Sequence, residues 1–270
     1  MNRRSANIIL PAISACIWLG AIIMPHQIVN ATELTHQFGP GSFGDPAWMR
    51  RYNPALEHFQ LDRGGWQTNY RGGDGAQPMN TAGFKSRFKV DGNFTAGLNY
   101  TLLQADTPPR GGGVGILFRI HFGDDANITT IGHVRRPGGQ IIMFVNSKHD
   151  GESTYQQFPA RLGASEMEIR HLGDGQYAFF GGSGGAMAKE LCRATGPVGK
   201  PGQIDIWATT GQTTTPLKAT VSAVHVDAEE LPVGQVAATP RRFPWYWIAF
   251  CAAMVGGFGW LYRSLKTSSE

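Results

Sequence analysis

The sequence has little cysteine, and this excludes several ways of stabilising a fold. Only three of the 270 residues are cysteines, and Cys16 and Cys251 lie in apolar segments at the two ends of the chain. Cys192 therefore has no disulfide partner within the central region. No group of Cys and His residues has the ligand spacing of a zinc site. The central region must be stabilised by its own hydrophobic core.

The central region also lacks a surplus of either charge. The whole chain has a formal net charge of +4, but Arg3, Arg4, Arg263, Lys266 and Glu270 lie beyond the two apolar segments, at the chain ends. Without these residues, 20 basic and 19 acidic residues remain. Nucleic-acid binding needs clustered Lys and Arg, so this balance argues against it.

A helical pattern of useful length is missing between Phe84 and Val226, whereas glycine is abundant, with 36 residues. What is present is alternation with a period of two. Apolar residues occupy every second position from Val114 to Phe122, and the segment MEIRHLGDGQYAFF alternates on both sides of Gly-Asp-Gly, as a hairpin does. Strands are predicted at residues 84–90, 114–122, 129–134, 140–145, 167–171, 176–180, 204–209 and 219–226, with turns at 91–93, 108–113, 137–139, 173–175 and 201–202.

These strands are expected to form antiparallel sheets, because parallel sheets need crossover helices. Two such sheets packed face to face give a sandwich. The order of FKSRFKV, GVGILFRI, QIIMFVN, MEIRHLGDGQYAFF and GQIDIWATTG resembles the concanavalin A-like lectin and glucanase jelly roll, including its laminin-G-type and bacterial branches. The resemblance covers residues 80–232 and implies an all-β, antiparallel, two-sheet jelly-roll sandwich. Residues 32–80 are less regular, and either complete the sandwich edge or wrap around it.

The N-terminal segment has the layout of a secretory signal. Arg3 and Arg4 precede an apolar run from Ile8 to Ile23, and Val29-Asn30-Ala31 offers small residues for cleavage. Residues 1–31 are predicted to be a signal peptide, with an uncleaved N-terminal anchor as the alternative.

The C-terminal segment predicts a membrane anchor. Residues 244–262 carry no charge and are about as long as the ~20 residues that cross a ~30 Å hydrocarbon core, with aromatic residues at both ends. We predict a transmembrane helix at 244–262, a linker at 233–243 and a cytoplasmic tail at 263–270. An exported N-terminus would place the sandwich, residues 32–232, outside the cytoplasm of a single-pass cell-membrane protein.

Five residues are candidates for ligand binding, because each lies on the polar side of an alternating strand. If their strands share a sheet, an aromatic ring with charged neighbours lines its outer face. Sugar sites are often built this way, since C–H faces stack on tryptophan while hydroxyls bind charged groups. The candidates are Arg119, His121, Arg170, Asp205 and Trp207.

Asp124, Asp125 and Asn127 place three oxygen-bearing side chains in one short loop. Oxygen ligands suit calcium, although the spacing is not that of an EF-hand. The resemblance to laminin-G-type domains implies calcium binding in loops. The alternative is a polar turn without metal.

No catalytic residue is assigned. Glucanases of the resembled fold carry Glu-x-Asp-x-x-Glu on one strand, and this chain has no such pattern. Glu166 and Glu168 share one face, ~6.6 Å apart along a strand, but neighbours on one strand are poorly placed to flank a glycosidic bond. The sequence therefore favours an anchored binding module for a glycan or cell-envelope polymer. The alternatives are a glycan-active hydrolase and a structural envelope protein with a protein partner.

Overall fold

The computed structural model describes residues 33–38, 48–52, 58–62, 64–73, 75 and 77–230, which belong to one compact unit, Ala31–Glu270. The predicted signal segment, linker, transmembrane helix and tail lie outside these residues. Within them, no helix is long and apolar enough to cross a membrane. The strands are β1 (Glu33–Gln37), β2 (Met49–Tyr52), β3 (Phe59–Asp62), β4 (Gly65–Tyr70), β5 (Thr81–Ala105), β6 (Val114–His121), β7 (Ile128–Arg135), β8 (Ile141–His149), β9 (Glu152–Pro159), β10 (Gly163–His171), β11 (Gln176–Gly182), β12 (Lys189–Thr195), β13 (Gly202–Thr209) and β14 (Leu217–Glu230).

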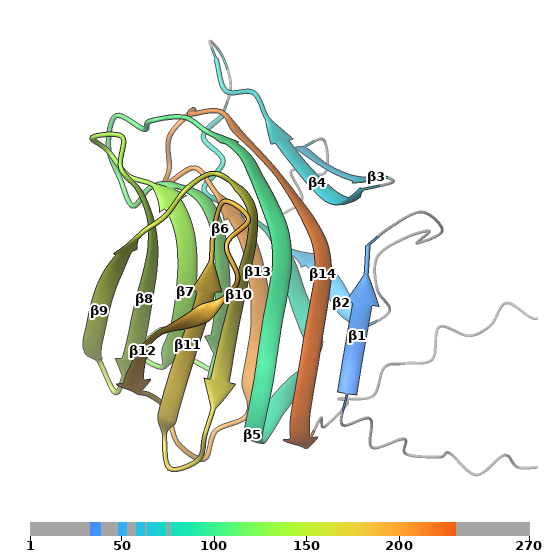
Figure 1. Cartoon of the computed structure of the whole chain (residues 1–270), viewed down its shortest axis with the longest axis vertical. Coiled ribbons are helices and arrows are strands. Elements are labelled where there is room, and N and C mark those ends of the chain that lie inside the picture. Colours follow the sequence, from blue (N-terminus) through green and yellow to red (C-terminus); the bar gives the residue numbers. More distant parts are fainter. Residues whose placement is uncertain are drawn as a thin grey trace, which may run out of the picture. The chain divides into compact units, whose positions relative to one another are not determined.

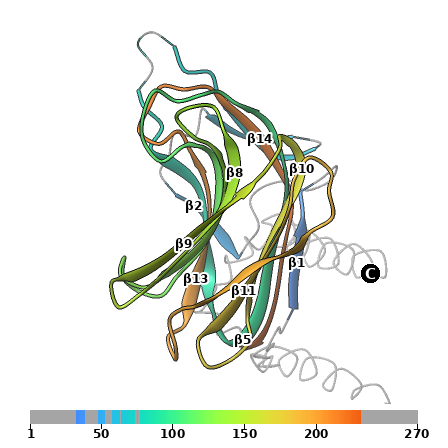
Figure 2. The ribbon, with the colours of Figure 1, turned by 60° about the vertical axis from the view of Figure 1, so that its left-hand side comes forward.

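The described strands form two layers. Every pair of hydrogen-bonded strands among them is antiparallel, as the sequence predicted. Sheet A contains β1, β3, β4, β14, the second half of β5, β10, β11 and β12. Sheet B contains β2, the first half of β5, β13, β6, β7, β8 and β9. Sheet A lies in front in Figure 1, and Figure 2 shows both layers from another side.

Strand β5 joins the two sheets. Its residues from Thr81 to Val90 pair with β13, and those from Asp91 to Ala105 pair with β14. The sequence predicted a turn at residues 91–93 that would end the strand. The structure instead shows one strand that bends there from sheet B into sheet A, with Gly92 at a φ of 66°. A positive φ costs glycine no steric strain, which explains why the turn-like sequence occurs within a strand.

The core lies between the sheets and follows the predicted alternation. In β6, Ile116, Phe118 and Ile120 are fully buried, and in β13 so are Ile204 and Ile206. At about 25 cal/mol per Å² of apolar area removed from water, such stripes are the main stabilising contribution. The irregular segment at 32–80 completes the sandwich edges: β1 and β4 pair with β14, while β2 pairs with β5.

One polar pair is enclosed in this core. The hydroxyl of Tyr100 on β5 lies 2.8 Å from Nδ1 of His133 on β7, and both side chains are buried. Burial lowers the pKa of His133 to about 4 and raises that of Tyr100 well above its usual value. His133 is therefore a neutral hydrogen-bonding group at neutral pH.

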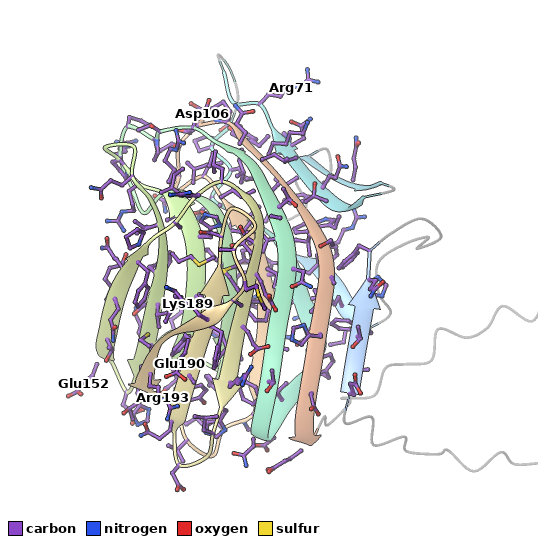
Figure 3. The ribbon with its side chains drawn as sticks, viewed as in Figure 1. Arg71, Asp106, Glu152, Lys189, Glu190 and Arg193 are labelled. Atoms are coloured by element: carbon purple, nitrogen blue, oxygen red, sulfur yellow. The ribbon has the colours of Figure 1, made fainter. Side chains whose placement is uncertain are left out.

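The edge strands of the two sheets differ. Strand β12 ends sheet A and carries Lys189, Glu190 and Arg193, which Figure 3 labels along it. Charges on an edge strand oppose pairing with another chain. Strand β9 ends sheet B, and nearly all of its residues are exposed.

Candidate functional site

Two rows of side chains cross the outer face of sheet B. The first runs through Tyr52, Gly83, Trp207, Leu117, Gly132 and Phe144, each in register with the next. The second runs through Arg50, Lys85, Asp205, Arg119, Thr130, Asn146 and Tyr155. Residues in register on antiparallel strands lie on the same face, so one row is largely apolar and its neighbour is polar.

Two glycines of the apolar row lie where a side chain would collide with a neighbouring strand or ring. A Cβ atom on Gly132 would lie 2.3 Å from the ring of Phe144, and one on Gly83 would lie 1.9 Å from the backbone oxygen of Ile206. Neither position can take a larger side chain without displacing its neighbours. In register, Gly83 lies between Tyr52 and Trp207, whose rings stack.

Trp207 lies at the centre of a ladder of aromatic and cationic groups. Its ring stacks on Tyr52, with centroids 5.4 Å apart and planes at 11°. On the side of β6, the Arg119 guanidinium lies 4.2 Å from the Trp207 centroid. The Lys85 ammonium lies 4.1 Å from the centre of the Tyr52 ring. Contacts of this kind contribute about 0.5–2 kcal/mol each, so the ladder fixes these side chains in place.

Asp205 lies in the polar row beside this ladder, in register with Lys85 and Arg119. Although it is on the outer side of β13, it is only 1% exposed. Lys85 Nζ lies 3.9 Å from its carboxylate, but neither carboxylate oxygen accepts a hydrogen bond from the part of the chain that the structure describes. Burial raises the pKa of Asp205 to about 6, against the attraction of Lys85 and Arg119. A buried carboxyl group with such a pKa is typical of functional sites.

The structure places the predicted ligand residues in two groups. Arg119, Asp205 and Trp207 lie together on β6 and β13 of sheet B, and His121 lies one step along β6, 3.5 Å from Asp125. Arg170 lies on β10 of sheet A. The condition that the strands of all five residues share one sheet therefore fails for Arg170, because β10 and β13 pair with different halves of β5.

Arg170 belongs to a separate cluster on the outer face of sheet A. Its Nε atom donates to Glu168 at 2.5 Å, its guanidinium lies 4.0 Å from the Phe180 centroid, and His225 Nε2 lies 3.3 Å from Glu168. The hydrogen bond with His225 and the charge of Arg170 lower the pKa of Glu168 against the effect of burial. A general acid in glycoside hydrolysis needs the opposite shift, so this geometry suits Glu168 to a structural ion pair.

The predicted calcium residues do not converge on one point. Asp124 Oδ1 accepts hydrogen bonds from the backbone N–H of Ala126 and from Asn127 Nδ2. Asn127 Oδ1 accepts one from the backbone N–H of Asp150, whereas the Asp125 side chain is 98% exposed. Among the described residues, no group of three or more His, Cys, Asp or Glu side chains could hold a metal ion. Calcium binding at this loop stays a prediction.

No protein-family model and no curated protein matches the chain. Solved structures do match. A prokaryotic beta-1,3-1,4-glucanase (lichenase) derived from a mouse hindgut metagenome superposes with a TM-score of 0.50 at 13% identity, over 72% of this chain and 98% of that one. The GH43 protein BlXynB from Bacillus licheniformis superposes with a TM-score of 0.51 at 13% identity. The match covers 72% of this chain but only 39% of the length of BlXynB.

The chain has a concanavalin A-like jelly-roll fold. The resemblance drawn from the order of strands is thereby confirmed. At 13% identity, the similarity to these solved structures establishes the fold alone. Any function must therefore be argued from the residues of this chain.

The sequence did not reveal three members of the site. Tyr52 and Arg50 lie on β2, which has four residues and too short an alternation to stand out. Lys85 was visible as a polar residue of an alternating strand, but nothing in the sequence indicated that β5 lies beside β13. The opposite charges of Lys85 and Asp205 suit a cross-strand pair, but the structure is what shows that their strands are neighbours.

Proposed function

We propose that the chain is a carbohydrate-binding module whose ligand lies across the outer face of sheet B. The aromatic and cationic ladder centred on Trp207 is the observation that carries this proposal. Sugar rings present C–H faces to aromatic side chains and hydroxyls to charged groups, and the two adjacent rows supply both kinds of contact.

The face can accept a polymer as well as a single sugar. Tyr52 and Tyr155 are 38% and 43% exposed and lie on β2 and β9, at opposite edges of sheet B. Six strand spacings separate them, which corresponds to roughly 30 Å along a flat sheet. Tyr52 and Arg119 flank the Trp207 ring, and Lys85 lies over the Tyr52 ring, so a sugar would contact the exposed edges of these rings together with the cations beside them.

The geometry favours binding over hydrolysis. Asp205 is the one carboxylate among the described strand residues of this face, whereas glycoside hydrolysis generally uses two carboxyl groups ~5–9.5 Å apart. The solved structures with this fold include a glucanase, as its name states.

The first test is a glycan-array screen of the full chain in detergent, run with calcium and with a chelator. Replacing Trp207 with alanine removes the centre of the ladder, and we expect binding of any array glycan to weaken roughly tenfold or more. The matched control is Phe180→Ala, which removes a ring stacked by Arg170 on the other sheet and should leave binding unchanged.

Three results would speak against the proposal: no glycan bound by a demonstrably folded chain, unchanged binding by Trp207→Ala, or equal losses in the two variants. Loss of binding in chelator would assign a role to the loop that contains Asp124 and Asn127. Equal binding in both buffers would show that glycan binding does not need calcium.

Membrane anchoring is also part of the proposal, supported by the uncharged, aromatic-flanked segment at residues 244–262. The sandwich would then face a cell-envelope polymer from the outer side of the membrane. We expect the full chain to resist extraction by alkaline carbonate, and a chain ending at residue 240 to be released. Release of both chains would contradict anchoring by this segment, and retention of both would assign it to the N-terminal segment.

A further inference from the structure

The outer face of sheet B carries strong positive charge, although the chain's central region is nearly neutral. Core residues alternate with outward residues along β5, β6 and β8, which assigns each charged side chain to a face. For all of the basic residues except Arg87, register confirms the assignment, because they pair with outward residues of the neighbouring strands. Arg87 is assigned by alternation alone, because it lies at the register shift between Lys85 and Lys89. The outward basic residues are Arg50, Lys85, Arg87, Lys89, Arg119 and Lys148.

This charge is poorly compensated. Among the described strand residues of the face, Asp205 is the one carboxylate, and it is buried. Asp125 approaches His121 from a loop at the rim of the sheet. The remaining acidic side chains of the described strands lie elsewhere, for example Glu168 on sheet A and Glu190 on β12. A surface with one dominant sign of charge attracts ligands of the opposite sign.

We propose that the ligand of this face is an acidic polysaccharide, one that carries carboxylate or sulfate groups along its chain. This inference rests on the proposed carbohydrate-binding function and narrows its ligand class. The basic row binds the acid groups and the adjacent apolar row contacts the sugar rings. A polyanion without free sugar faces, such as double-stranded DNA, would use only the first of these rows.

The spacing of the basic groups suits a repeating acid. Lys85 and Arg119 lie in the same row, two strand spacings apart, which is about 10 Å and comparable to the length of a disaccharide. Arg50, one strand further out, is exposed. Asp205 lies between Lys85 and Arg119 and holds the two cations against their mutual repulsion. It is a positioning residue in this account.

The experiment measures binding of the full chain in detergent to five soluble polymers at low and high salt. Polygalacturonate carries carboxylates, and its methyl ester is the neutral match. Dextran sulfate carries sulfates, and dextran is its neutral match. Double-stranded DNA is the polyanion without a free sugar face. We expect at least one acidic polysaccharide to bind more than tenfold more tightly than its neutral match, with the preference reduced by salt.

The variant Arg50→Gln with Lys85→Gln removes two basic groups of the face. We expect it to weaken binding of the acidic polymer by roughly tenfold or more, because hydrogen bonds to charged groups contribute more than neutral ones. The matched control is Lys218→Gln, which removes an exposed lysine from β14 of sheet A and should not change binding.

The outcomes separate this inference from the proposed function. Preference for polygalacturonate or for dextran sulfate, lost in the double variant, supports the inference and names the acid group. Equal binding of acidic and neutral forms overturns it while leaving carbohydrate binding in place. DNA binding as tight as that of either polysaccharide, or equal losses in the control variant, also overturns it, since charge alone would then explain the result. A folded chain that binds none of the five polymers overturns it, and a glycan-array hit alongside would keep the proposed function.

Discussion

Replacing Asp205 with asparagine is expected to raise the free energy of unfolding by roughly 3 kcal/mol at pH 7. Burial raises the pKa of Asp205 from 3.8 to about 6 in the folded chain, and each unit of difference corresponds to about 1.4 kcal/mol. The folded state therefore binds the Asp205 proton more tightly than the unfolded state does. Above pH 6 the ionised carboxylate lowers stability, whereas below pH 3.8 both states are protonated and the contribution disappears.

The measurement is urea unfolding of the full chain and of Asp205→Asn, followed by tryptophan fluorescence between pH 3.5 and pH 8. The stability difference should be near zero at the acid end, grow as the pH rises from 3.8 to about 6, and stay level above that. A destabilised variant at pH 7 would contradict the account, and would show that Asp205 stabilises Lys85 and Arg119 by more than its burial costs. A residue retained at such a cost in stability is typical of a functional site.

His133 is expected to have the opposite pH dependence, of similar size. Burial lowers its pKa from 6.5 to about 4 in the folded chain, so the unfolded state binds this proton more tightly. The stability that neutral His133 contributes is fully present above pH 6.5 and is lost as the pH falls toward 4. This loss of unfolding free energy is roughly 3 kcal/mol. Below pH 4 the enclosed imidazole must become charged beside Tyr100, or the core must open.

The variant for this test is His133→Gln, which cannot take up the proton but keeps hydrogen-bonding groups for the Tyr100 hydroxyl. The advantage of the wild-type chain over the variant should shrink as the pH is lowered from 7 to 4, in the same urea titrations. A stability difference that is constant across this range would mean that His133 titrates normally, and would contradict its placement in a dry core. Because this test uses a difference between two chains, the other titrating groups cancel.

The fold could be predicted largely because apolar and polar residues alternate along the strands that form the core. The stripes of β6 and β13 are fully buried as predicted. The second half of β5 was missed although Phe94, Leu98 and Leu102 alternate there, because a turn was assigned at residues 91–93. Turn-forming residues indicate a change of direction, and here the change is a bend of one strand between two sheets.

Alternation assigns a residue to a side of its own strand, but it does not say which strands share a sheet. Arg119, Asp205 and Trp207 meet because β6 pairs with β13. Arg170 has the same pattern in the sequence and lies on the other sheet. That distinction depends on long-range pairing along β5. For the same reason, the nearly equal numbers of basic and acidic residues in the central region did not indicate a basic face. The balance holds for the central region as a whole and not for each of its surfaces.

The most direct test of the proposed site is amide hydrogen exchange of the full chain with and without its tightest-binding array glycan. A ligand across the outer face of sheet B should slow exchange in β2, β13 and β6, beside Tyr52, Trp207 and Arg119, and leave β10 to β12 unchanged. Protection confined to β10, β11 or β14 would place the glycan on sheet A. That result would contradict the assignment of the ligand face.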